Sequence, residues 1–139
     1  MKNLLIFFLL NIIFLGCAGK GTPGYESLKL SIEEQEKLAP LTFLNVDGKL
    51  WENLIGQTVI EGDITSSATV AKFKDVVLKV NFYTKTGTFL GSEDFVVYEF
   101  VNPSQSVHFK IKSFGPESAE KIEIEISKAV SVDEWDLSI

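Results

Sequence analysis

The feature that most constrains the fold is a two-residue alternation of side chains in the second half of the chain. Apolar residues recur at every other position over 76–83, 107–112 and 121–127, and residues 58–64 and 95–101 are strand-like in composition. Successive side chains of a strand point to opposite faces, so this alternation predicts strands with one buried face. No long helical pattern separates these segments. We therefore predict an all-β fold, an immunoglobulin-like antiparallel β-sandwich.

The last two alternating segments predict a hairpin with a defined register. If Lys112 lies opposite Glu123, then Lys110 lies opposite Glu125, and the isoleucines between them share the other face. Opposite charges across a strand pair contribute about 0.2–1 kcal/mol each. The register is therefore consistent with one charged face and one apolar face.

The same alternation predicts which side chains form the core. We expect Leu78, Val80, Phe109 and Ile124 to be buried, because each occupies an apolar position of its segment. Most of the aromatic residues at strand spacing are also expected in the core. These are Phe43, Trp51, Phe73, Tyr83, Phe89, Phe95, Tyr98 and Phe100.

The dipeptide Asp47-Gly48 has two interpretations. It is typical of a type I′ hairpin turn after a strand over residues 41–46. Alternatively, Asp47 caps a short helix that ends at Gly56 and whose apolar face is Leu50, Trp51, Leu54 and Ile55. The sequence alone does not choose between them.

The segment before the sandwich predicts a short helix on a flexible tether. Ser31 followed by Glu34 is a capping-box signature, and Pro40 ends a helix at about Ala39. The three glutamates of this helix are interpreted as a solvated face rather than a cation site. The glycine-rich residues 18–24 read as a tether that spans roughly 15 Å.

The N-terminus predicts an export signal. A short basic start precedes the apolar run 4–15, which is too short to span a bilayer, since spanning takes about 20 residues. The run ends in Gly16-Cys17, which resembles the lipobox of bacterial lipoproteins. This resemblance implies that Cys17 is acylated (palmitate is the expected acyl chain) and that residues 1–16 are removed.

Charge and composition exclude several classes of protein. The chain has 139 residues, no Arg and a formal net charge of -6, which argues against binding to nucleic acid. Cys17 is the single Cys, so no intrachain disulfide forms.

We expect four segments: signal peptide 1–16, tether 17–40 with a possible short helix, β-sandwich 41–130 and acidic tail 131–139.

The stretch from Thr58 to about Ile126 resembles the FxLYD-type domains of bacterial envelope proteins. Residues 59–67 are similar to the first strand of those domains, residues 76–87 to their central strand and following Gly turn, and residues 102–109 to their Pro-containing bend. Thr84 stands where the family usually has Asp, and Ser66 where Asn is common. The resemblance implies an immunoglobulin-like, non-catalytic domain outside the cytoplasm, and it supplies no site residues.

No constellation of residues predicts catalysis. His108 is the single His, and in the predicted hairpin its neighbours are Lys110 and Ser127 rather than an acid and a nucleophile. No set of ligands has zinc spacing, and residues 133–136 lack the alternation of a calcium loop. We therefore predict no enzymatic activity, no catalytic residue, no metal and no cofactor.

Two functional hypotheses follow. The first is a membrane-tethered binding or scaffolding module of the bacterial cell envelope, lipid-anchored through Cys17 and facing either the periplasm or the exterior. The alternative is an accessory lipoprotein that recognises a carbohydrate or peptide through an exposed aromatic residue, Trp51 or Tyr83. Apart from the membrane, the expected partner is an envelope protein or glycan, and not nucleic acid.

Overall fold

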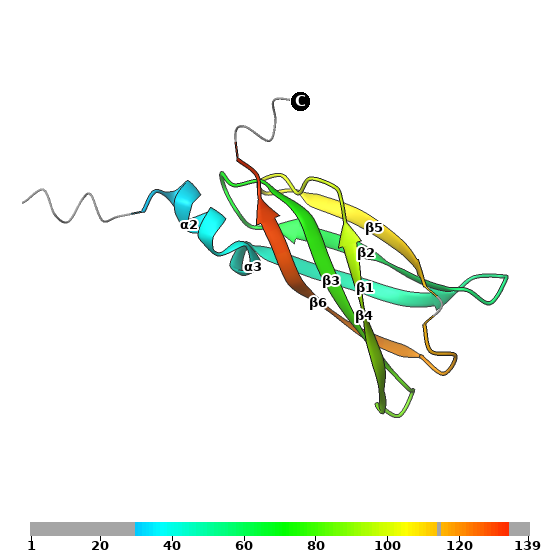
Figure 1. Ribbon diagram of the computed structural model, residues 1–139. Helices are drawn as coiled ribbons and strands as arrows, with labels where there is room; N and C mark the ends of the chain where they lie inside the picture. The colour runs from blue at the N-terminus through cyan, green and yellow to red at the C-terminus, as the bar shows by residue number, and fades with distance from the viewer. Residues whose placement is uncertain (1–29, 114, 134–139) are drawn as a thin grey trace, which may run out of the picture.

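The computed structural model describes residues 30–113 and 115–133 and confirms an all-β sandwich of two antiparallel sheets (Figure 1). Within these described residues, two short helices precede six strands. The elements in chain order are α2 (Ile32–Leu38), α3 (Pro40–Phe43), β1 (Leu44–Glu52), β2 (Thr58–Ser66), β3 (Phe73–Tyr83), β4 (Phe89–Val97), β5 (Ser106–Ser113) and β6 (Lys121–Ser131).

Each sheet has three strands. One sheet has the order β1-β2-β5 and the other has the order β4-β3-β6, so β2 and β3 are the two central strands. Immunoglobulin-like sandwiches have the same order, with strands A, B and E side by side in one sheet and strands C′, C and F side by side in the other. The alternation over residues 76–83, 107–112 and 121–127 therefore predicted strands correctly.

The predicted hairpin between residues 107–112 and 121–127 is wrong. β5 pairs with β2 and β6 pairs with β3, so the two strands lie in different sheets. Lys110 lies opposite Glu61, and Glu125 lies opposite Lys79. The charge pattern is satisfied equally well by these partners, and the connection between the strands is long enough to cross from one sheet to the other.

Both interpretations of Asp47-Gly48 are wrong, because the dipeptide lies inside β1. Gly48 pairs with Gly62 of β2, and a Cβ atom on Gly48 would lie 2.7 Å from the Cδ1 atom of Ile124 in the other sheet. A Cβ atom on Gly62 would overlap the backbone of Asp47. The glycines therefore allow close approach inside a continuous strand pair, and the reversal comes later, at residues 53–57.

Two strand boundaries also differ from expectation. Pro40 begins α3 rather than only ending a helix, so the first strand starts at Leu44. The aromatic segment 95–101 is not one strand, because β4 ends at Val97. Tyr98 and Phe100 consequently lie in the connection to β5 and are exposed.

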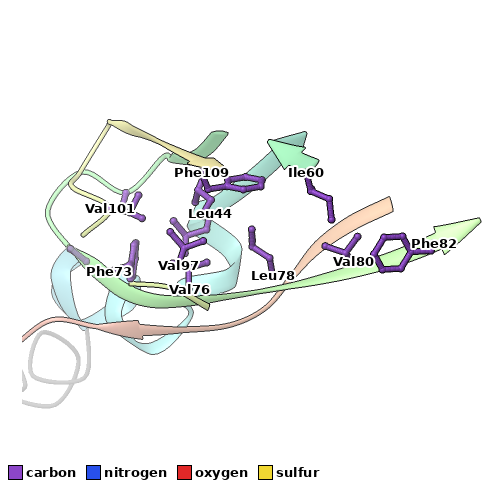
Figure 2. Packing of buried hydrophobic residues seen from close by; sticks show 13 residues of the cluster. Leu44, Ile60, Phe73, Val76, Leu78, Val80, Phe82, Val97, Val101 and Phe109 are labelled. Carbon is purple, nitrogen blue, oxygen red and sulfur yellow. The ribbon is translucent and has the colours of Figure 1, made fainter. Parts of the chain in front are cut away.

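The core lies between the two sheets (Figure 2). Leu78, Val80 and Phe109 are buried as predicted, whereas Ile124 is only partly buried because β6 is an edge strand. The largest fully buried side chains come from the central strands β2 and β3, together with Val101 of the β4–β5 connection. They are Phe73, Phe82, Ile60, Ile64, Leu78, Val59, Val76, Val80 and Val101.

The antiparallel topology gives the sandwich two distinct ends (Figure 1). The helix end carries α2, α3, the β2–β3 connection (67–72) and the β4–β5 connection (98–105). The turn end carries the β1–β2 turn (53–57), the β3–β4 turn (84–88) and the β5–β6 connection. A strand of nine residues separates the ends by about 30 Å.

Candidate functional site

The predicted lipidation residue, Cys17, lies outside the described residues. Residues 134–139 of the predicted acidic tail, which include Trp135, also lie outside them. Across 30–113 and 115–133 the structure contains no helix that is long and apolar enough to cross a membrane.

His108 lies on the exposed face of β5 and has a different neighbour from the one expected. Its Nδ1 atom is 3.2 Å from Oδ1 of Asp63 on β2, and both side chains are mostly exposed. Ser127 belongs to the other sheet. The hydroxyl of Ser106, two residues before His108, is 2.8 Å from the hydroxyl of Thr65 instead. The His–Asp pair therefore has no activated hydroxyl hydrogen-bonded to it.

The helix α2 forms with the predicted capping box. The Ser31 hydroxyl accepts from the backbone N–H of Glu34, and the Glu34 carboxylate accepts from the backbone N–H of Ser31. These hydrogen bonds lower the pKa of Glu34. The same helix has basic Lys37 in its last turn, where it complements the helix dipole.

Glu36 does not belong to a solvated helix face, which corrects the expectation for the acidic cluster. Its side chain is 2% exposed and accepts four hydrogen bonds from the β2–β3 connection. The backbone N–H and hydroxyl of Thr69 donate to Oε1, and the N–H groups of Val70 and Ala71 donate to Oε2, at 2.7–2.9 Å. We call this arrangement the Glu36 latch.

The latch fixes α2 to the body of the sandwich. Burial raises the pKa of Glu36, but the four hydrogen bonds outweigh that effect and lower the pKa to about 2. Lys37 adds a second attachment, since its Nζ atom is 3.3 Å from Asp133 after β6 and 2.7 Å from Glu33. The helix end is therefore where the chain from Cys17 enters the domain.

The turn end presents two large aliphatic side chains to solvent. Leu54 is 106% exposed and Ile55 is 84% exposed. The turn that carries them is well ordered by Asn53, whose Oδ1 atom accepts from the N–H groups of Ile55 and Gln57. We call Leu54 and Ile55 the apolar tip. Two adjacent aliphatic side chains that are almost fully exposed make this turn a candidate contact site.

A groove of about 570 Å³ lies beside the apolar tip. Trp51 and Glu52 of β1 line one side, and Glu117 and Glu120 of the β5–β6 connection line the other. The sequence named Trp51 both among the aromatic residues expected mostly in the core and as a possible exposed anchor, and the structure places it on the outer face of β1 with 36% of its surface exposed. We call this hollow the Trp51 groove.

The indole of Trp51 is held in place by a charged network on the outer face of its sheet. The Nζ atom of Lys110 lies 5.0 Å from the centroid of the indole ring. The Glu61 carboxylate bridges two lysines, with Oε1 3.4 Å from Nζ of Lys49 and Oε2 3.6 Å from Nζ of Lys110. Burial raises the pKa of Glu61, but hydrogen bonding from Lys49 and Trp51 and the charge of Lys110 outweigh it and lower the pKa. Trp51 is thus a positioned aromatic residue at the edge of the groove.

Tyr83, the other aromatic candidate, is less suited to binding. Its hydroxyl donates to Glu123 at 3.1 Å, which raises the pKa of the phenol, and its ring contacts Phe89 edge to face. Of the residues described, no three His, Cys, Asp or Glu side chains form a group that could hold a metal ion. The groove and the tip are therefore the arrangement best suited to binding.

Comparison with known proteins gives no match: no protein-family model, no curated protein and no solved structure matches this chain. The resemblance to FxLYD-type domains stays a prediction. The sequence had indicated Trp51 as a possible anchor, whereas the apolar tip was missed because Leu54 and Ile55 fitted the apolar face of the alternative short helix.

Proposed function

We propose that this chain is a non-enzymatic, membrane-tethered binding or scaffolding module of the bacterial cell envelope. One observation carries the proposal: the chain from Cys17 enters at the helix end, which the Glu36 latch fixes, whereas the apolar tip lies at the opposite end. An anchored domain with this geometry presents its tip away from the bilayer by about 30 Å. The partner is an envelope protein with an apolar pocket for Leu54 and Ile55.

The anchor is tested by replacing the acceptor thiol. Cys17→Ser is expected to move the protein from the membrane fraction to the soluble fraction and to abolish labelling by an alkyne-tagged fatty acid. Stable anchoring needs two or more acyl chains, so losing the thiol removes attachment rather than weakening it. The lipoprotein assignment is contradicted if the variant stays in the membrane pellet and the wild type takes up no fatty-acid label.

The binding role is tested at the apolar tip. Leu54→Ser with Ile55→Ser is expected to change the free energy of unfolding by less than about 0.5 kcal/mol, because neither side chain is buried. The same double variant, used as bait in a crosslinked envelope fraction, is expected to lose a partner that the wild type captures. Val96→Ser, on an exposed position of β4, is the control and should keep that partner. Equal capture by all three baits contradicts a binding role for the tip.

The Trp51 groove supports a second candidate function, recognition of a glycan or peptide. Its indole offers a flat face, and the carboxylates of Glu52, Glu117 and Glu120 offer hydrogen-bond acceptors along its walls. Trp135→Phe leaves Trp51 as the single indole, so a change in its fluorescence on adding purified glycans or cell-wall peptides reports binding. Abolition of that change by Glu120→Gln supports the second candidate, and no change in fluorescence removes it.

A further inference from the structure

Exposed apolar side chains gather at the helix end as well as at the tip. Tyr98 is 78% exposed, and Phe100 and Val70 are about half exposed. The N-terminal helices add Ile32, Leu38 and Leu41, which are also exposed. Such side chains on neighbouring loops mark a contact surface.

Helix α2 and the two connections meet around one hollow. It has a volume of about 190 Å³, and its walls include Val70, Lys72 and Pro103 together with the ion-paired Glu33, Lys37 and Asp133. The Nζ atom of Lys72 lies 5.1 Å from the ring centroid of Phe100. The β2–β3 connection, the β4–β5 connection and α2 therefore form a single face, which we call the helix-end face.

The position of the tether indicates what this face contacts. The chain runs from Cys17 to the first turn of α2 through residues 18–29. The sequence predicts a tether here, and a tether of this length would span about 20 Å, which is shorter than the roughly 30 Å between the two ends of the sandwich. Because the Glu36 latch and Lys37 hold α2 to the body, the helix-end face is the part of the domain closest to an anchor at Cys17.

We propose that the helix-end face rests on the surface of the bilayer that holds the anchor, with Tyr98 and Phe100 in the interfacial region. This inference rests on the proposed lipid anchor at Cys17. Tyr98 suits that position, since a tyrosine ring with its polar end favours the headgroup level, and the stem of Lys72 covers apolar surface next to Phe100 while its ammonium stays in water. The anchor raises the local concentration of the face at the membrane, so a few side chains suffice.

The test attaches the mature chain to vesicles without relying on cellular acylation. Cys17 is the single thiol, so it couples to a maleimide-headgroup lipid in vesicles of brominated phosphatidylcholine. With Trp51→Phe and Trp135→Phe as background, Tyr98→Trp places an indole on the helix-end face. Phe89→Trp places one at the turn end, on an exposed position at the other end of strand β4, which Tyr98 directly follows. Val70→Trp provides a second reporter on the other connection.

The expected result is quenching of the indoles introduced by Tyr98→Trp and Val70→Trp, with a blue shift in their emission. The indole introduced by Phe89→Trp is expected to keep its emission unchanged. Absence of quenching at position 98 and position 70, or equal quenching at all three positions, overturns the inference. Because coupling is chemical, either outcome is separate from the fate of the anchor, which the Cys17→Ser fractionation decides.

Discussion

The substitution Glu36→Gln tests whether one buried carboxylate fixes the N-terminal helix to the sandwich. The carboxylate accepts from four donors, namely three consecutive backbone N–H groups and the Thr69 hydroxyl. A glutamine has one acceptor oxygen, and its NH₂ group would face donors of the same kind. We therefore expect α2 to lose its attachment while the sheets persist.

The magnitude follows from the pKa of Glu36, which is about 2 in the folded protein against 4.5 as its ordinary value. A lowered carboxylate pKa stabilises the folded state fully above the unfolded pKa, and this stabilisation is lost as the pH falls from about 4.5 to 2. At pH 3.2, unfolding takes up about 0.9 proton at this group, and at pH 7 it takes up almost none.

The assay is urea denaturation of wild type and variant between pH 7 and pH 3. The free energy of unfolding of the wild type should fall more steeply with acidification than that of Glu36→Gln, by a slope that corresponds to about 0.9 proton near pH 3.2. Glu34 and Glu61 also have lowered pKa values, but they are present in both proteins and cancel in the comparison. Hydrogen exchange at the amides of residues 69–71 should accelerate in the variant.

Glu99→Gln is the matched control, because it makes the same change of charge at an exposed position. Its pH dependence should follow that of the wild type. If Glu36→Gln and Glu99→Gln gave the same slope, or if the amides of residues 69–71 exchanged as slowly as before, the latch would not hold the helix and the reasoning would be refuted.

Two further predictions concern the sandwich. Leu78→Ala should lower the free energy of unfolding by about 2–5 kcal/mol, and exposed Glu123→Ala by less than about 1 kcal/mol; equal losses in urea denaturation would place Leu78 outside the core. Gly48→Ala should cost about 1–3 kcal/mol from overpacking, and Gly62→Ala should cost more, because its Cβ would overlap the backbone of Asp47, which cannot move aside as a side chain can. Adding Ile124→Ala should recover part of the loss only for Gly48→Ala, because the new Cβ atom at position 48 meets the Cδ1 atom of Ile124. If the losses from Gly48→Ala and Ile124→Ala simply added in the double-mutant cycle, this contact between the two sheets would be contradicted.

The sandwich was predictable because burial of one sheet face imposes a period of two on the sequence. Which strands pair with each other was not predictable, because a period of two determines the face on which each side chain lies and not which strand lies beside it. Lys110 finds Glu61 and Lys79 finds Glu125, although the sequence allowed Lys110 and Glu125 to pair with each other.

Local signals gave mixed results for a physical reason. The capping box of Ser31 and Glu34 involves groups three residues apart, so it was readable and is confirmed. Asp47-Gly48 has the composition of a turn, but Gly48 meets Gly62 across a strand pair, and that requirement is invisible without knowing the partner strand.

The candidate sites depend on long-range contacts, and the sequence anticipated them only in part. Glu36 meets its donors 33 to 35 residues later in the chain, so no local pattern distinguishes it from a solvated glutamate. The sequence predicted Trp51 as a possible exposed anchor, but it did not predict the groove beside this residue. The apolar tip was hidden, since Leu54 and Ile55 suit a helix face as well as a turn.

The Glu36 latch also decides how a pulling force would travel through the domain. A force on the tether that acted directly on β1, an edge strand, would peel it from β2 one hydrogen bond at a time. Glu36 instead attaches the helix to the connection between β2 and β3, the central strands of the two sheets. Tension from the N-terminus therefore enters the middle of both sheets together, so the latch must yield before β1 can be stripped from its edge.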